Sequence, residues 1–454
     1  MSVKINIMSF GNFRKKVIFT PELGKRAEHL SIFSACCTAM GDVPFTDAAI
    51  IILYANMLGA SEAFSMITTA LLPLAIGLFA VPSAKIVGMV SSYQKTILVC
   101  TLFALLMFGG VVIAPFMGQF AVAFLLLSLC LFAVSHTIYI AAWFPLLDNF
   151  VTAQRRSRYL GTMRFAWQLS AAILLLGVSL VIGKKPPVWM LQLTMLMSMM
   201  IFACKLYFIG SIPQFIHPEE QSGKRVPDLD FKKGLATALA NKSLAGYSVY
   251  LFILNLAAYG TIPLTTLYLK KSLMAPDNVI VLISSLVLTG MLAGSFFAGL
   301  LITRYGIKKI FLWVHISYAA VNLALFFMGR SLIAGDIIYY LIGGILFIYS
   351  FTFACANISS SSEMMAIATP GNKVMAMAFC NAFYYGGCGL SRIMTSLIIG
   401  SGALAANWSI GNMAFTHYQT LFLLYAICVI FAASLLVVVP AIFPKGEYIY
   451  AIHQ

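Results

Sequence analysis

Long apolar segments recur along this chain, and they constrain its fold more than any other feature. Twelve stretches are each about as long as the roughly 20 apolar residues that an α-helix needs to cross a bilayer. They lie at 30–57, 63–88, 96–115, 119–143, 159–182, 188–210, 244–269, 278–303, 309–329, 334–358, 374–402 and 417–443. Only 9% of the 454 residues are charged, which excludes an ordinary soluble protein. Because the segments are too long for membrane β-strands, we expect an all-α membrane protein with twelve transmembrane helices.

The basic residues predict the orientation of the chain in the bilayer. If both termini are cytoplasmic, five Lys and Arg fall in outer loops, Lys205 and Arg392 fall within spans, and the other 22 of the 29 face the cytoplasm. This asymmetry follows the positive-inside rule and favours a plasma (inner) membrane protein. Membrane insertion and anionic lipid also account for the net charge of +15. We therefore expect the lipid bilayer as a partner, no nucleic acid, and a monomer.

A polar linker divides the chain into two parts with six apolar segments each. We predict a basic cytoplasmic tail (1–29), an N-terminal six-helix bundle (30–210), a cytoplasmic linker (211–243), a C-terminal six-helix bundle (244–443) and a cytoplasmic tail (444–454). The sequence GDVPFTD at 41–47 matches GTIPLTT at 260–266 in Gly, Pro and Thr, and Lys85 and Arg304 are separated by the same 219 residues. This internal repeat predicts two duplicated halves that run parallel.

Twelve helices in two parallel six-helix halves, joined by a long cytoplasmic linker, resemble the major facilitator superfamily. The motif that carries the resemblance is the loop between the second and third helices of each half, which in the family reads approximately Gly-x-x-x-Asp-Arg-x-Gly-Arg-Lys. The second half reads GLLITRYGIKK and keeps Gly299, Arg304, Gly306, Lys308 and Lys309, with Thr303 in place of the Asp. The first half keeps only Lys85, Gly88 and Lys95. The resemblance implies a transporter that works by rocking-type alternating access.

We predict a cytoplasmic gate at the inner ends of the helices. Cationic side chains there can meet helix C-terminal carbonyls or carboxylates across the cleft, in contacts that form and break as the halves rock. The candidates are Lys85, Asp148, Arg155, Arg156, Arg304, Lys308, Lys309 and Glu363. The alternative is that the basic residues among them only reflect the positive-inside rule.

Two carboxylates, Asp42 and Asp47, lie within the first span beside Pro44. A charged carboxylate near the bilayer centre costs at least about 2.5–3.5 kcal/mol on insertion scales, so its presence needs a reason. Pro44 has no N–H and loosens the helix, and broken helices of this kind line the binding site in transporters. We therefore predict that Asp42 and Asp47 line a cavity and couple a proton or cation, or bind a cationic group. Alternatively, Asp42 is a protonated buried residue and Asp47 caps a local break.

Further cavity candidates lie in other spans. Arg392 is always charged, so it must face a carboxylate, a substrate anion or water, or form a structural ion pair, for instance with Asp47. His136 titrates near neutral pH unless burial keeps it neutral, and Lys205 is expected to snorkel. The remaining candidates are Tyr139, Trp143, Asn255, Tyr259 and Thr261, together with Asn357, Tyr384 and Tyr385.

No enzyme motif is found: the chain has no P-loop, HExxH or GxSxG sequence. The nine cysteines show no metal-ligand spacing, so we expect no cofactor, no metal site and no enzyme activity. The leading hypothesis is a secondary active transporter, a symporter that moves a small polar organic solute with a proton or cation. Two alternatives remain: an exporter of amphipathic or cationic compounds that Asp42 and Asp47 bind directly, and a membrane sensor or scaffold that transports nothing.

Overall fold

The computed structural model describes residues 17–90, 92–151, 153–216, 231–333, 335–369, 372–411 and 413–438. The first group of helices comprises α1 (Pro21–Thr46), α2 (Ala48–Met57), α3 (Glu62–Met89), α4 (Tyr93–Ile113), α5 (Ala121–Asp148), α6 (Ala153–Val181) and α7 (Val188–Gly210). A 3-10 turn, Ala114–Phe120, joins α4 to α5. At its Gly118 the backbone adopts a φ of 56°, a conformation that glycine tolerates best.

The second group comprises α10 (Lys242–Ala258), α11 (Thr261–Leu267), α12 (Asp277–Tyr305), α13 (Ile307–Phe327), α14 (Ile337–Ile367), α15 (Lys373–Ser401) and α16 (His417–Val438). A π-turn, Tyr268–Ser272, continues α11. The short helix α9 (Phe231–Ala240) precedes this group. Strands β1 (Val17–Ile18) and β2 (Phe215–Ile216) pair in parallel, whereas β3 (Asn407–Ile410) and β4 (Met413–Thr416) form an antiparallel hairpin.

Every predicted apolar segment overlaps a helix, but some ends differ. The largest differences are in α1, which begins at Pro21 although the predicted segment begins at 30, and in α14, which continues to Ile367 although the predicted segment stops at 358. The extension of α14 contains a run of serines whose hydroxyls donate to carbonyls one turn back, for example Ser360 to Ala356 and Ser361 to Asn357. These local hydrogen bonds satisfy the hydroxyl groups, so a polar run continues the helix.

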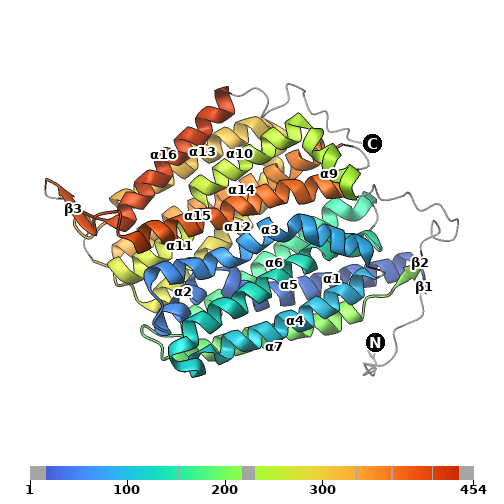
Figure 1. Cartoon of the computed structure of the whole chain (residues 1–454), viewed down its shortest axis with the longest axis horizontal. Coiled ribbons are helices and arrows are strands. Elements are labelled where there is room, and N and C mark those ends of the chain that lie inside the picture. The colour runs from blue at the N-terminus through green and yellow to red at the C-terminus, as the bar shows by residue number, and fades with distance from the viewer. Residues whose placement is uncertain are drawn as a thin grey trace.

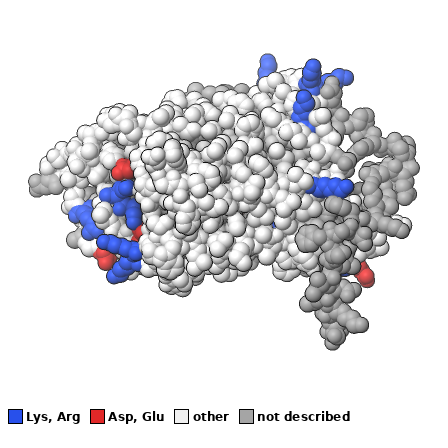
Figure 2. All heavy atoms as spheres, turned by 60° about the horizontal axis from the view of Figure 1, so that its bottom comes forward, with Lys and Arg blue, Asp and Glu red and all other residues white. Residues whose placement is uncertain are grey.

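The described chain has the composition of a multi-pass membrane protein. In the described residues, nine helical stretches are long and apolar enough to cross a membrane, or ten if α1 and α2, bent by 48°, count as one span. The stretch Tyr93–Asp148 counts once in this number, and α15 is not included. Figure 2 shows Lys and Arg gathered at the two ends of the molecule, with a broad face free of charge between them. This distribution fits a bilayer around the middle of the helices.

The helices lie side by side between two ends of the molecule (Figure 1). We call the end with α9, β1 and β2 the linker end, and the end with the β3–β4 hairpin, α2 and α11 the hairpin end. Helices α1 to α7 pack mainly against one another, as do α10 to α16, and the two groups meet through α3 against α15 and through α6 against α12. In Figure 1 the first group lies below and the second group above.

The contact between α3 and α15 depends on glycine. A Cβ atom on Gly77 would lie 2.5 Å from the backbone nitrogen of Gly386, and one on Gly389 would lie 2.7 Å from the Cα of Leu74. Real Cβ atoms do not approach backbone that closely, so larger residues would force the two helices apart.

The two groups are joined at the hairpin end by several contacts. The backbone N–H of Asp277 donates to the carbonyl of Lys184 at 3.0 Å, and the Ser396 hydroxyl donates to the carbonyl of Ala63 at 2.8 Å. Glu62 on α3 lies 3.6 Å from His417 on α16. Helix α2 is enclosed at this end, since every residue from Ala48 to Ala55 is buried. The hairpin end is therefore closed.

Candidate functional site: a central cavity

A cavity of about 440 Å³ lies between the two groups of helices. Residues of α1, α2, α3, α5 and α6 line it on one side, and residues of α11, α12, α14 and α15 on the other. The polar and aromatic residues of the wall are Thr38, Asp42, Phe45, Thr46, Asp47, His136, Tyr139, Trp143, Arg164, Trp167, Gln168, Tyr259, Ser295, Tyr349, Phe353, Asn357, Tyr384, Tyr385 and Arg392. Most of the cavity residues that the sequence predicts thus line the same cavity.

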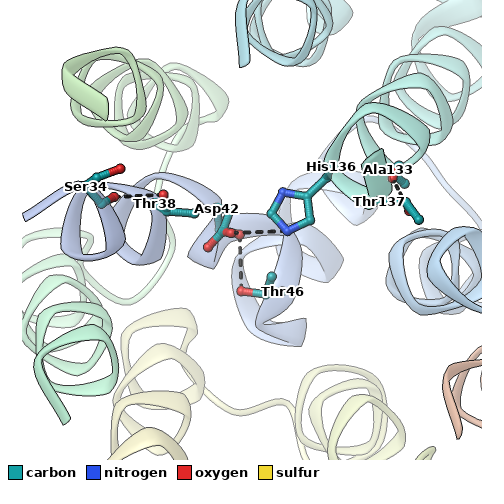
Figure 3. Close-up of polar contacts among 7 residues, drawn as sticks. All are labelled: Ser34, Thr38, Asp42, Thr46, Ala133, His136 and Thr137. Atoms are coloured by element: carbon teal, nitrogen blue, oxygen red, sulfur yellow. Dashed lines mark hydrogen bonds and ion pairs between the residues drawn. The ribbon is translucent and has the colours of Figure 1, made fainter. Parts of the chain in front are cut away.

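Asp42 faces this cavity from α1. The polar residues Ser34, Thr38, Asp42 and Thr46 recur every four residues and lie along one face of the helix (Figure 3). The His136 ring, on α5, points toward the Asp42 carboxylate, with 3.8 Å between Nε2 and Oδ2. Asp42 is only 2% exposed. Its Oδ1 and the Nδ1 of His136 are buried and have no hydrogen-bond partner among the described residues.

Lys205 does not snorkel, contrary to the prediction. Its side chain is 1% exposed, its Nζ lies 3.2 Å from the centre of the Tyr139 ring, and it interacts electrostatically with Asp42. The reason is that Lys205 lies on the face of α7 that packs against α1. The sequence carried a signal for this: Met195, Ser198 and Phe202 precede it at helical spacing and are also buried.

Asp47 both lines the cavity and caps a helix. Helix α1 ends at Thr46, and α2 begins at Ala48. Between them, the Asp47 Oδ1 accepts a hydrogen bond from the backbone N–H of Ala49 at 2.9 Å. This is the usual role of an aspartate at a helix N-cap. The wall of the cavity also includes Asp47, so the two interpretations considered for this residue are compatible.

The two broken helices differ in the position of the break. The repeat would place both breaks at matching residues, yet α1 breaks at Asp47 whereas α10 ends at Ala258, before Gly260. In the second half Pro263 is the third residue of α11, where no intrahelical donor is required. In the first half Pro44 lies inside α1, and the helix ends two residues later.

Arg392 reaches from α15 across to α3. Its Nη1 donates to the backbone carbonyl of Thr69, and its guanidinium carbon lies 4.8 Å from the centre of the Tyr259 ring. The side chain is 8% exposed, and its Nε has no acceptor in the described part of the chain. Although Asp47 interacts with it electrostatically, no ion pair within 4 Å joins the two among the described residues.

The sequence analysis does not predict the polar and aromatic wall residues of α6. Arg164, Trp167 and Gln168 line the cavity, although Arg164 had been assigned to the cytoplasmic side only because it is basic. Their spacing of three and four residues places them on one face of the helix, and this was the available signal. Conversely, Asn255 and Thr261 lie outside the cavity wall. Asn255 donates to the carbonyl of Tyr384 at 3.4 Å, and the Thr261 hydroxyl lies 3.1 Å from Asn322 Oδ1, so both connect neighbouring helices.

Among the described residues, no ion pair of Lys85, Arg155, Arg304, Lys308 or Lys309 joins the two groups of helices. Arg155 forms one, with Nη2 at 2.8 Å from Glu28 Oε2, but Glu28 belongs to α1 of the same group and had not been predicted. Lys85 lies 5.5 Å from the Phe231 ring of α9. Of the others, Asp148, Arg304, Lys308 and Lys309 are exposed and Glu363 is buried. The side chain of Arg156 lies outside the described residues.

The wall residues differ in exposure. Arg164 is exposed and Gln168 and Asn357 are half-buried, whereas Asp47 and Arg392 are buried. Counted along their helices at 1.5 Å per residue, Arg164 and Asn357 lie nearer the linker end than Asp47 and Arg392 do. At the hairpin end, α2 is buried, whereas the wall residue nearer the linker end, Arg164, is exposed.

No protein-family model and no curated protein sequence matches this chain. Solved structures of transporters do match its fold. The nucleoside transporter NupG has a TM-score of 0.65 and 15% identity, over 91% of this chain and 98% of its own. A POT family transporter in complex with a thioalcohol-conjugated peptide has a TM-score of 0.65 and 12% identity, over 93% and 96%. A D-xylose-proton symporter has a TM-score of 0.63 and 11% identity, over 90% and 96%.

Proposed function

Because the chain has the fold of major facilitator superfamily transporters, we propose that it is a secondary active transporter. It carries a small polar organic solute across the membrane by alternating access, in symport with a proton or cation. It works as a monomer in the plasma membrane, and the linker end faces the cytoplasm, where the positive-inside rule places both termini. The closed hairpin end and the accessible linker end then correspond to an inward-facing state.

The proposal includes twelve membrane crossings in two six-helix halves, 30–210 and 244–443, joined by the cytoplasmic linker. The 56-residue stretch Tyr93–Asp148 would be about 84 Å long as one straight helix, far more than a bilayer is thick. It therefore crosses twice, with the turn at Gly118. The bent pairs α1–α2 and α10–α11 each form one crossing, and α15 crosses in the interior, packed between α3 and α10.

One observation supports coupling at this site above all. Two buried polar atoms beside the cavity, Asp42 Oδ1 and His136 Nδ1, have no hydrogen-bond partner in the described part of the chain, although buried polar atoms nearly always have one. A proton, a cation or a polar group of the cargo can occupy that place. Binding there changes the charge next to Lys205, and this is the kind of local electrostatic change that biases two conformations of a packed protein.

Transport into proteoliposomes with an imposed pH gradient tests the proposal. A ligand-stabilisation screen of the purified protein first identifies a transported solute. The wild type is then expected to accumulate this solute down the proton gradient, and Asp42→Asn to lose the accumulation while it keeps solute counterflow. Asp336→Asn is the matched control, because Asp336 is an exposed residue at the start of α14, outside the cavity. Equal accumulation by Asp42→Asn and wild type would remove Asp42 from the mechanism.

The same assay separates the alternatives. Loss of both accumulation and cargo binding in Asp42→Asn would favour direct recognition of a cationic compound, as in the exporter hypothesis. Arg164 and Arg392 in the same wall disfavour that hypothesis, since they repel a cation. A sensor or scaffold would show no counterflow in the wild type.

A further inference from the structure

Arg392 belongs to the cavity wall and has a guanidinium nitrogen without an acceptor among the described residues. A guanidinium can bind a carboxylate side-on through Nε and Nη2, or end-on through Nη1 and Nη2. Here Nη1 already donates to the Thr69 carbonyl, which fixes the plane of the group. The Nε on the other edge is buried and has no acceptor among the described residues. This is the arrangement that accepts a planar anion side-on.

The charges around the cavity are complementary to an anion. The acidic groups are Asp42 and Asp47, whereas the basic groups are Arg164 and Arg392 in the wall and Lys205 behind Asp42. Asp42 interacts electrostatically with Lys205, and Asp47 with Arg392. The interactions of Arg164 are with Tyr384 and Tyr385. With Asp42 and Asp47 ionised, Lys205 protonated and His136 neutral, the region would carry one more positive than negative charge, which a monoanion would neutralise.

The rest of the wall fits an organic body attached to such an anion. The Tyr259 ring lies under the Arg392 guanidinium, and Trp167, Tyr384 and Tyr385 provide further aromatic surface. Gln168 and Asn357 add neutral hydrogen-bonding groups. A cavity of about 440 Å³ is within the range of small-molecule sites.

We propose that the cargo is a small organic carboxylate, and that Nε and Nη2 of Arg392 bind its carboxylate group. Arg164, nearer the linker end, attracts the anion into the cavity. The proposal rests on the proposed transport function and specifies its substrate class. It also assigns separate roles to the two ends of the site, with cargo at Arg392 and the coupling ion at Asp42.

Matched ligands test the proposal on purified wild-type protein at pH 7.5. The panel consists of small monocarboxylates, each with its primary amide and its amine, for example phenylacetate, phenylacetamide and phenethylamine, with phenyl phosphate as a second anion. Binding is followed by the rise in Tm and by tryptophan fluorescence, because Trp143 and Trp167 line the cavity. A carboxylate is expected to bind at least about tenfold more tightly than its amide, as for hydrogen bonds to charged groups.

Variants then locate the binding site. Arg392→Gln is expected to weaken carboxylate binding about tenfold or more, and Arg392→Lys to restore part of it because it keeps the charge but not the side-on geometry. Arg26→Gln is the control, since Arg26 is an exposed arginine of α1 outside the cavity. If an Arg392 variant does not fold, the comparison of carboxylates with their amides and amines on the wild-type protein still tests the proposal.

Several results would overturn the carboxylate proposal: no stabilisation by any carboxylate of the panel, tighter binding of the amine or of the phosphate, or unchanged carboxylate binding in a folded Arg392→Gln. None of these results would contradict the proposed transport function. Proteoliposomes could still transport a neutral or cationic solute. Conversely, a protein that binds carboxylates but shows no counterflow would contradict the transport function and leave the binding site in place.

Discussion

Buried charged residues in the first group of helices lie together rather than singly. Asp42 faces His136 across 3.8 Å, and Lys205 interacts electrostatically with Asp42 while its Nζ lies against the Tyr139 ring. A charge in the interior is tolerated when partners compensate its loss of hydration. Asp42 and Lys205 therefore depend on each other, and the stability of the fold is linked to the residue that we propose for coupling.

A double-mutant cycle tests this dependence. Lys205→Met is expected to lower the free energy of unfolding by up to about 3–5 kcal/mol, because it leaves the Asp42 carboxylate buried without its cation. In the double variant Lys205→Met/Asp42→Asn the loss is expected to be much smaller than the sum of the two single losses. The stability of the wild type, the two single variants and the double variant is measured by thermal unfolding in detergent. Lys184→Met is the control, because Lys184 is exposed. Additive losses would show that the two charges do not interact.

At the scale of elements, the contact between α3 and α15 connects the two groups of helices along much of their length. Glycines on both helices permit backbone contact at Gly77 and Gly386, and Arg392 adds a hydrogen bond from α15 to the α3 backbone at Thr69. Small residues that allow close approach are typical of helix packing in membranes. The position of Arg392 over the cavity thus depends on how closely these two helices lie.

Substitution of a single glycine tests this element. Gly77→Ala would place a Cβ 2.5 Å from the Gly386 backbone nitrogen, so we expect a loss of about 1–3 kcal/mol, the usual effect of overpacking. The control is Gly109→Ala in α4, where an added Cβ has no atom within 4 Å. That change is expected to be neutral or slightly stabilising, because alanine favours a helix more than glycine does. A Tm for Gly77→Ala equal to that of Gly109→Ala would contradict close packing of α3 and α15.

At the scale of the whole molecule, the two ends differ in closure. Contacts between the groups at the hairpin end involve backbone hydrogen bonds and the pair Glu62–His417. At the linker end, no ion pair of Lys85, Arg155, Arg304, Lys308 or Lys309 crosses between the groups among the described residues. Alternating access requires these contacts to exchange, so that the hairpin end opens when the linker end closes.

Accessibility of an introduced cysteine checks which end is open. Ser295 is half-buried in the cavity wall, and we expect Ser295→Cys to react with a small membrane-impermeant thiol reagent faster in inside-out than in right-side-out vesicles. Reaction is measured above that of the parent protein, which contains nine cysteines. Lys184→Cys, exposed at the hairpin end, should react only in right-side-out vesicles. Faster reaction of Ser295→Cys from the outside would reverse the assigned orientation or the open end.

The sequence by itself determined the class of the protein, the positions of its apolar helices and the presence of buried carboxylates beside a helix break. These features depend on hydropathy over about 20 residues and on local backbone chemistry at residues such as Pro44 and Asp47. Only the tertiary structure decided that Lys205 and Arg164 lie at the site, that Asn255 and Thr261 do not, and that Arg392 bonds to Thr69 instead of pairing with Asp47. The reason is physical: the rotation of each helix and its distance from its neighbours follow from packing between segments far apart in the chain. Local spacing shows which residues share a face of a helix, but it does not show which neighbour that face meets.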